Sequence, residues 1–523
     1  MAARNNKSRG RLLVFLSVAV AAIAVAVVAV GGPDNGSHAQ ATGKPPVVLL
    51  TFDELPVDSL LGPDGRIDAA RYPNFAALAA KSTWYPNATA AHDSTNKAVP
   101  AILDGRRPRA KVPATLAGHK ENVFTLFGGR GYRVVASEEA TSMCPRSICN
   151  ARGGVGRIKK LMRNGRVKRF ARWLATISPG KPSFYYKHLF LPHGPRVYLP
   201  SGRQLTSTPT GPLTGLSDTR GYFDRGLTNH NHLRYLLQLG FADRVLGRLL
   251  AKLRREGLFD EAMIAVVSDH GYAFDVATRD RRLLTSRNID ENAPVVAFIK
   301  APGQRQGAVD KAYIRTFDIL PTMAAGLGLR LDWRHEGRPV SDPSVRNRRR
   351  VTIPKRFFNG TVSISTAELE KRRRANIRHA VRLFGTGARS KRAYGSPYAS
   401  LYRIGPNGGL LGRRLAGLRT APPGLLRIHV PDLGARQSVS AKRPLPSRIA
   451  GTISGGRGTR NLAVVVNGRV RAVGRSLYVR GGRQELFTML VPEDALRQGR
   501  NDVRVYEVSG RGRGRVLTLL GRA

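Results

Sequence analysis

Cysteine is scarce in this sequence: the 523 residues include only Cys144 and Cys149. A fold held together by several disulfides is therefore excluded. Outside the cytosol, two cysteines so close in sequence favour a local disulfide, and we predict a Cys144–Cys149 bond that closes one short loop. A zinc pair and a free reactive thiol are the alternatives, but no further cysteine or nearby histidine completes a set of four zinc ligands.

Acidic residues are also few. The chain has 35 Asp and Glu against 87 Lys and Arg, which gives a formal net charge of +52. Such a charge attracts polyanions or anionic membrane surfaces. No zinc finger, helix-turn-helix signature or RNA-binding aromatic motif accompanies it, so nucleic acid is not an expected partner. A general bias toward arginine codons, spread over a solvated surface, is the alternative explanation of the charge.

Long apolar runs are absent except at residues 12–30, an uncharged stretch that would span about 28 Å as a helix, close to a bilayer core. Basic residues precede it within 1–11, which predicts that the N-terminus stays inside and the bulk of the chain is exported. We therefore predict a cytoplasmic tail (1–11), a single transmembrane anchor (12–30) and a flexible linker (31–45) in a cell-membrane protein. Cleavage of a signal peptide near Ser37-His38-Ala39, giving a secreted protein, is the alternative.

Residues 46–340 alternate apolar strand patterns with helical patterns. Strands are expected at 46–52, 131–137, 181–190 and 262–268, and the leucine spacing of 232–254 is typical of a helix. This alternation predicts an α/β domain with a mostly parallel sheet and helices on both faces.

The residue composition of the remaining chain changes twice. Residues 341–421 are rich in arginine and read as a basic, partly helical connector, with a helix over 366–384 that Ser365 or Thr366 caps. Residues 422–523 contain short β-rich segments separated by turn signals such as Asn467-Gly468, which predicts a C-terminal β-sandwich domain.

Polar residues that suit catalysis follow the ends of two predicted strands. Asp53 and Glu54 close the first strand, and Asp269 and His270 close the strand at 262–268. Carboxylates and an imidazole at the carboxyl edge of a parallel sheet suit a divalent metal such as Zn²⁺ or Mn²⁺. Between these strands, Ser94-Thr95 opens a short helix, where a metal-activated hydroxyl next to a helix N-terminus suits attack on an anionic ester.

Several motifs resemble the sulfatase-like branch of the alkaline phosphatase superfamily, in the order expected for that family and over about 46–330. The matching segments are Thr51-Phe52-Asp53-Glu54, Thr95 through Arg106, Leu191-Pro192-His193-Gly194-Pro195, Ala242 through Gly247, Val267-Ser268-Asp269-His270-Gly271, Pro302-Gly303-Gln304 and Phe317 through Thr322. The resemblance implies an alkaline phosphatase-like fold and a metal-dependent hydrolase or transferase.

The resemblance also implies roles for particular residues. One divalent cation (Mn, Zn, Ca or Mg) is expected on Asp53, Glu54, Thr95, Asp269 and His270. Thr95 is the expected nucleophile, with Ser94 as the alternative. His193 is expected to contact the substrate or assist the leaving group. The expected substrate-binding residues are Lys97, His188, Arg287 and Asn288.

One departure from the family pattern affects the predicted reaction. Sulfatases carry Cys or Ser within Cys/Ser-x-Pro-x-Arg, whereas this window reads Thr95-Asn96-Lys97-Ala98-Val99. Thr at this position resembles phosphodiesterases and the phosphoglycerol and phosphoethanolamine transferases. We therefore expect phosphoester chemistry on anionic lipid headgroups or envelope polymers. A true sulfuric ester hydrolase and a non-catalytic binder of anionic polymers are the alternatives.

Overall fold

A buried, mostly parallel sheet lies at the centre of the N-terminal part of the chain. The computed structural model describes residues 43–149, 153–206, 224–277, 280–431, 438–479 and 482–522. Strand β1 (Val47–Asp53) lies between β4 (Ser183–Pro192) and β5 (Met263–Ser268), parallel to both, and every residue of the three strands is buried. Continuous apolar strands of this kind are typical of parallel sheets covered on both faces.

Four further strands complete this sheet. The order is β3-β4-β1-β5-β6-β2-β7, with β3 parallel to β4, and β6 antiparallel to β5. Their bounds are β2 Thr83–Trp84, β3 Arg133–Ser137, β6 Ala297–Lys300 and β7 Ala308–Val309. The sheet is thus parallel in its centre, where the predicted site residues lie, and mixed toward one edge.

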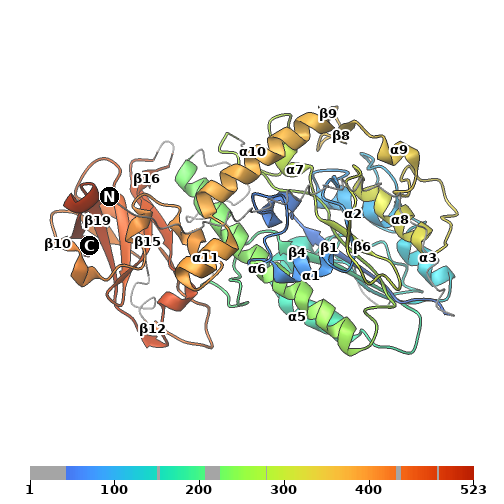
Figure 1. The fold of residues 1–523 in the computed structure, drawn as a ribbon, viewed down its shortest axis with the longest axis horizontal. Coiled ribbons are helices and arrows are strands. Elements are labelled where there is room, and N and C mark those ends of the chain that lie inside the picture. Colours follow the sequence, from blue (N-terminus) through green and yellow to red (C-terminus); the bar gives the residue numbers. More distant parts are fainter. Residues whose placement is uncertain are drawn as a thin grey trace, which may run out of the picture. The chain divides into compact units, whose positions relative to one another are not determined.

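Alternate residues of β1 face two different helical layers (Figure 1). Val48, Leu50 and Phe52 share an apolar cluster with α1, α5 and α6, whereas Val47 and Leu49 share another with α2, α3 and α8. The first layer is α1 (Pro73–Ala79), α5 (Arg166–Ala175) and α6 (Arg225–Arg255), and the second is α2 (Thr95–Asp104), α3 (Val123–Gly129) and α8 (Ile319–Gly326). Successive side chains of a strand point to opposite faces of the sheet, so those of β1 enter both apolar clusters. The predicted α/β fold is confirmed.

The basic segment 156–175 contains two short helices rather than one continuous helix. α4 (Ile158–Arg163) ends before Asn164, and Gly165 adopts a left-handed φ of 68° before α5 begins. Glycine takes this conformation without steric cost, so the chain changes direction there. Cys144 and Cys149 form a disulfide, as predicted.

The segment that follows the sheet forms a hairpin and a long helix. Strands β8 (Arg350–Pro354) and β9 (Thr361–Ser365) pair antiparallel, and α10 (Thr366–Phe384) begins directly afterwards. The Ser365 hydroxyl accepts a hydrogen bond from the Glu368 N–H, which caps the helix as predicted. Three short helices have the bounds α7 Ile289–Asn292, α9 Pro343–Arg346 and α11 Gly387–Tyr394.

Two five-stranded sheets form the C-terminal part. Their orders are β10-β20-β19-β14-β15 and β16-β17-β13-β11-β21. The bounds are β10 Arg419–Ala421, β11 Arg427–His429, β13 Arg448–Ser454, β14 Asn461–Val466, β15 Arg469–Arg475, β16 Leu477–Tyr478, β17 Glu485–Leu490, β19 Val503–Ser509, β20 Val516–Leu519 and β21 Gly521–Arg522. Ile449 and Phe487 of one sheet share an apolar cluster with Val464 and Val505 of the other.

Two details of these sheets follow from the sequence. Asn467 and Gly468 join β14 to β15 with φ of 50° and 74°, the two left-handed residues that a tight hairpin turn needs. Strand β10 precedes residue 422, so the sheets begin slightly earlier than the predicted domain boundary. The division into 46–340, 341–421 and 422–523 remains a prediction.

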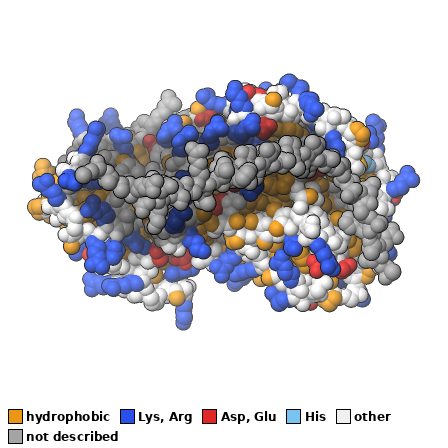
Figure 2. Space-filling model, viewed as in Figure 1, with side chains coloured by type: hydrophobic (Ala, Val, Ile, Leu, Met, Phe, Trp, Pro, Cys, Tyr) orange, Lys and Arg blue, Asp and Glu red, His pale blue; other side chains and the backbone are white. Residues whose placement is uncertain are grey.

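The predicted membrane segment 12–30 lies outside the described residues, as do 1–11 and most of the predicted linker. Among the helices that the structure describes, none combines the length and hydropathy needed to cross a bilayer. Lys and Arg side chains are scattered over the described surface on the face shown in Figure 2 rather than gathered in one patch.

The buried contact between α10 and the segment after β1 generates a stability prediction. Arg373, whose side chain is 6% exposed, donates to Asp58 Oδ1 at 2.7 Å and to Asn87 Oδ1 at 2.9 Å. Replacing Arg373 by Ala leaves the Asp58 carboxylate without its partner, so we expect the free energy of unfolding to fall by about 3–5 kcal/mol in urea titrations of the purified protein.

The next residue supplies a matched control. Arg374, 61% exposed, pairs with Glu370 on the surface of the same helix. Arg374→Ala should change the free energy of unfolding by at most about 1 kcal/mol. Equal losses for the two variants would contradict a structural role for the Arg373–Asp58 pair.

Candidate active site

Two acidic side chains meet at the carboxyl edge of the parallel sheet. Because Phe52 of β1 pairs with Ser268 of β5, Asp53 and Asp269 follow at adjacent positions of neighbouring strands. Asp269 Oδ1 accepts hydrogen bonds from the backbone N–H of Glu54 (3.2 Å) and of His270 (2.7 Å). These bonds fix the Asp269 carboxylate and leave its other oxygen directed elsewhere.

The N-terminus of α2 brings a hydroxyl to the same place. Thr95 is the first residue of α2, and its Oγ1 lies 3.2 Å from His270 Nε2 and 3.4 Å from Asp53 Oδ2. The neighbouring Ser94 hydroxyl instead donates to Asn96 Oδ1 at 2.6 Å. Of the two hydroxyls considered from the sequence, Thr95 is the one that faces the acidic pair.

The chemistry of this group fits a divalent cation. Asp53, Asp269 and His270 are buried, and each offers one ligand atom within 4.8 Å of the others. Among the described residues, Asp53 Oδ1 and Asp269 Oδ2 have no hydrogen-bond partner. His270 Nδ1 donates to the Gly271 carbonyl at 2.9 Å, so Nε2 presents a lone pair to the carboxylates. Buried carboxylate oxygens without a donor are costly unless a cation binds them.

Electrostatic interactions in the group are strong in both directions. Burial raises the pKa of Asp53, but the charges of His193, His188 and His270 outweigh burial and hold that pKa well below its ordinary value. Burial and the nearby Asp53 carboxylate raise the pKa of Asp269. Burial lowers the pKa of His270, yet the two carboxylates overcome this and raise it. Two adjacent buried carboxylates resist ionising together, and a bound cation would relieve that repulsion.

Glu54 belongs to a second group next to the first. Asp53, Glu54 and His193 also place one ligand atom each within 4.8 Å of one another. Glu54 Oε1 lies 3.3 Å from His193 Nε2, while two arginines, Arg196 (3.6 Å) and Arg282 (3.8 Å), also approach its carboxylate. Glu54 is thus placed either to bind a cation with Asp53 or to hold these basic side chains, and its ligand role remains a prediction.

The backbone of Glu54 is held in an uncommon conformation. Its φ is 60°, in the left-handed region that residues other than glycine seldom adopt, and its carbonyl accepts a hydrogen bond from the Tyr235 hydroxyl at 2.9 Å. Such residues persist where surrounding structure enforces them, often at functional sites. The turn directs Glu54 away from the strand axis toward His193.

His193 and His188 lie on either side of Asp53. His193 follows β4 and donates from Nδ1 to the Gly194 carbonyl at 2.6 Å, so Nε2 faces Glu54. His188, within β4, is fully buried, with Nε2 3.5 Å from Asp53 Oδ2. His188 is therefore placed to orient Asp53, and its substrate-binding role remains a prediction.

Three other predicted substrate-binding residues have structural partners instead. Lys97 Nζ donates to the carbonyls of Arg109, Ala110 and Val112, which uses all three of its hydrogens. Asn288 is buried and caps a turn, accepting from Thr285 N and donating to the Leu283 carbonyl. Nearby backbone groups therefore use the hydrogen-bonding capacity of both side chains.

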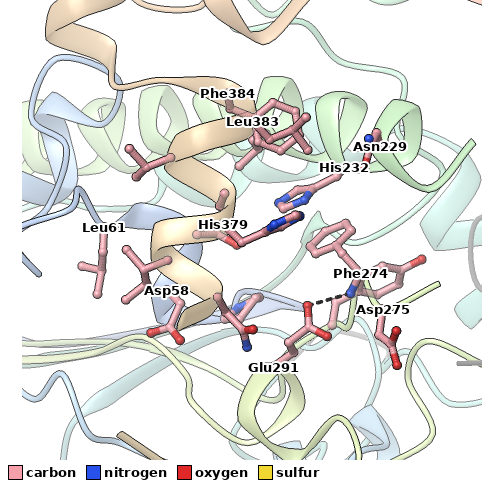
Figure 3. A pocket seen from close by; sticks show the side chains of 18 of the residues that line it. Asp58, Leu61, Asn229, His232, Phe274, Asp275, Glu291, His379, Leu383 and Phe384 are labelled. Atoms are coloured by element: carbon pink, nitrogen blue, oxygen red, sulfur yellow. Dashed lines mark hydrogen bonds between the residues drawn. The ribbon is translucent and has the colours of Figure 1, made fainter. Parts of the chain in front are cut away.

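Arg287, the last of these, lines a different cavity. Its Nε lies 3.1 Å from Asp275 Oδ2, at the rim of a cavity of about 370 Å³. Figure 3 shows the interior, where the His232 ring lies flat on Phe274 at 3.6 Å and Glu291 accepts from the Phe274 N–H at 2.9 Å. Within the described chain, Asp53, Thr95, Asp269 and His270 are not among the residues that line this cavity.

Arginines are the site residues that sequence reasoning missed. Arg196 and Arg282 approach Glu54, and Arg356 donates to the backbone carbonyl of Asp93, just before the nucleophile helix, at 3.0 Å. Arg196 follows the predicted His193-Gly194-Pro195 segment closely, which is a usable signal. Arg282 and Arg356 have no comparable sequence signal, because the chain contains 87 Lys and Arg residues.

The fold and this geometry define an α/β protein with a metal-type ligand set and a hydroxyl at one sheet edge. The sulfatase family model matches residues 45–329, more than half of the chain, and the protein therefore belongs to the sulfatase family. The predicted membership of the sulfatase-like branch of the alkaline phosphatase superfamily is confirmed, as is the prediction of an enzyme. It is a hydrolase of the kind that acts on sulfate or phosphate esters.

Solved structures with related folds are distant in sequence. A phosphonate monoester hydrolase from Silicibacter pomeroyi is 17% identical over 65% of this chain and 95% of its own, with a TM-score of 0.42. A putative sulfatase from Bacteroides thetaiotaomicron is 13% identical over 68% and 94%, with a TM-score of 0.44. A protein in complex with its substrate D-glucosamine-2-N,6-O-disulfate is 12% identical over 68% and 98%, with a TM-score of 0.45. No curated protein sequence matches the chain.

The ligand set predicts a measurable loss of metal affinity. Asp269→Asn removes a charged oxygen from the group, so we expect the dissociation constant for Mn²⁺ or Zn²⁺ to rise more than about 100-fold, beyond the effect of losing an outer hydrogen-bond partner. Isothermal titration calorimetry on the purified full-length protein measures this.

Asp332, an exposed acid that pairs with Arg130 at 3.1 Å, supplies the control. Asp332→Asn should leave the dissociation constant unchanged. Unaltered metal affinity in Asp269→Asn would contradict the ligand assignment.

Proposed function

We propose that the protein is a metal-dependent phosphoester hydrolase or transferase that uses Thr95 as its nucleophile. The observation that carries this proposal is the position of Thr95 Oγ1, 3.2 Å from His270 Nε2 and 3.4 Å from Asp53 Oδ2 at the start of α2. His270 Nδ1 donates to Gly271, so its Nε2 is the atom left to bind the cation, and Asp53 Oδ2, to which the Thr95 hydroxyl donates, can accept the Thr95 proton. A nucleophile within hydrogen-bond reach of a base is the arrangement that covalent catalysis requires.

Threonine at this position favours phosphoesters over sulfate esters. The window Thr95 to Val99 has neither the Cys or Ser that sulfatases convert to formylglycine nor the Pro and Arg of that motif. An unmodified hydroxyl attacks phosphorus readily when its charge is stabilised. A sulfate ester hydrolase is the second candidate, supported by the family to which the chain belongs.

The proposed reaction consists of two successive displacements at phosphorus. In the first, Thr95 Oγ1 bonds to phosphorus and the bond from phosphorus to the leaving oxygen breaks. His193, whose Nε2 faces Glu54, is placed to protonate that oxygen. In the second, water or an alcohol displaces the threonine oxygen, which recovers its proton. A divalent cation on Asp53, Asp269 and His270 would lower the pKa of a hydroxyl and neutralise charge on the phosphoryl oxygens.

The charge around the site favours an anionic substrate. Arg196, Arg282 and His193 surround Glu54, and the N-terminus of the ten-residue helix α2 adds the positive end of its dipole. With a cation bound, positive charge would exceed the three carboxylates of the site. This supports phosphoryl groups of lipid headgroups or envelope polymers as the substrate class.

We place the enzyme outside the cytoplasm, anchored through residues 12–30. The apolar run with its basic flank supports this placement, and the Cys144–Cys149 disulfide fits an oxidising compartment. In this arrangement the N-terminus lies inside the cell and the catalytic residues act on envelope components.

Removal of the nucleophile tests the reaction. Thr95→Ala should lower kcat for an aryl phosphodiester, measured with Mn²⁺ or Zn²⁺ present, by at least about 1,000-fold, because the covalent route is lost. Ser94→Ala should retain wild-type kcat, since Ser94 bonds to Asn96 rather than to the acidic pair.

The same assay separates the two candidate reactions. Faster turnover of an aryl sulfate than of the aryl phosphodiester by the wild-type protein would favour the sulfatase alternative. Wild-type turnover by Thr95→Ala would contradict the assignment of Thr95 as the nucleophile.

Fractionation of cells tests the placement. We expect the protein in the membrane fraction, with residues 1–30 still present when its N-terminus is sequenced. A soluble, exported chain that begins near residue 40 would show instead that the apolar run is a cleaved signal peptide.

A further inference from the structure

The hairpin β8–β9 lies outside the sulfatase match at 45–329, yet its tip contacts the approach to the nucleophile. Arg356 donates from Nη2 to the Asp93 carbonyl at 3.0 Å and from Nε to Asp93 Oδ1 at 3.4 Å. The Phe358 ring stacks on His92 with centroids 4.9 Å apart. Asp93 is two residues before Thr95, so the tip borders the site.

The loop 280–286 lies against the other side of Asp93. The Leu284 N–H donates to Asp93 Oδ2 at 2.7 Å, and Asp280 Oδ2 lies 3.3 Å from Arg356 Nη1. In the same loop, Arg282 Nε lies 3.8 Å from Glu54 Oε1. The hairpin tip and this loop therefore share one partner and lie on the same side of the site.

A groove of about 510 Å³ runs between the hairpin tip and this loop. Its residues include Leu283, Leu284, Lys355, Phe357, Asn359 and Val362. Phe357 is 76% exposed, and among the exposed large apolar side chains of the described residues only Leu425, at 84%, is more so. A large aromatic side chain in water at the edge of a site marks a surface that gains free energy when an apolar group covers it.

We propose that this groove holds the apolar part of an amphiphilic substrate, such as a phospholipid, whose anionic ester lies at Thr95. Arg356, which lines the groove, donates to the Asp93 carbonyl two residues before Thr95, so the groove adjoins the approach to the nucleophile. The exposed Lys355 at the tip suits the anionic head of such a molecule. This inference rests on the proposed function and names its substrate class.

Alkyl chain length is the variable that tests the groove. Octyl phosphate and methyl phosphate, titrated calorimetrically into the metal-loaded full-length protein, share a head and differ in the apolar part. We expect octyl phosphate to bind at least about tenfold more tightly, and Phe357→Ser to remove most of that difference while leaving methyl phosphate unchanged.

Leu425, 84% exposed in the C-terminal part, supplies the matched control. Leu425→Ser should leave the affinity for both phosphates unchanged. Equal affinities for the two phosphates, or equal effects of the two substitutions, would overturn the groove assignment.

Hydrolysis distinguishes failure of the groove from failure of the proposed function. The substrates are octyl and methyl p-nitrophenyl phosphate, and Phe357→Ser should raise KM about tenfold for the octyl ester only, with kcat retained. If neither ester is hydrolysed but octyl phosphate still binds more tightly through Phe357, the groove stands and the phosphoesterase proposal falls. A uniform fall in kcat for both esters, without a change in KM, would show that Phe357 only supports the hairpin.

Discussion

The close approach of two buried carboxylates, Asp53 and Asp269, is the constraint on which the site depends. Their strands are parallel neighbours in register, so both acids emerge at the same edge of the sheet. Side by side and buried, they cannot both stay ionised unless positive charge lies near them. Asp53 Oδ1 and Asp269 Oδ2, which have no hydrogen-bond partner among the described residues, leave a place for a cation that would supply that charge.

Glu54, the residue after Asp53, adds a third carboxylate, and its neighbours are basic side chains. Glu54, held with a φ of 60°, faces His193, Arg196 and Arg282 rather than returning to the sheet. A carboxylate here keeps basic side chains in place in the absence of substrate. An incoming phosphoryl group would find those side chains already oriented, so less ordering would be needed on binding.

Segments beyond the sulfatase match form part of the frame of the site. Two arginines from the predicted connector reach back to acids near the start of the chain, Arg373 to Asp58 and Arg356 to Asp93. The first contact packs α10 against the segment that follows β1, and the second holds the approach to Thr95. A region that reads as a basic linker therefore contributes to the fold, because two of its arginines pair with acids near β1 and α2.

Much of the fold could be predicted because local patterns reflect burial. Strands buried on both faces carry continuous apolar runs, as in 47–50, and the spacing of leucines follows the buried face of α6. The acids that close β1 and β5, and the threonine that opens α2, are likewise visible as interruptions of such patterns. The antiparallel direction of β6 has no such local signal, since strand polarity depends on which neighbour it joins.

Tertiary structure decided which polar residues serve the site and which serve the fold. Lys97 and Asn288 resemble substrate-binding residues by position, but nearby carbonyls and N–H groups satisfy them. Arg282 and Arg356 are indistinguishable in sequence from dozens of other arginines, and only folding sets them beside Glu54 and Asp93. Periodicity reports whether a residue is buried, whereas the partner of a charge is fixed by contacts between segments far apart in the chain.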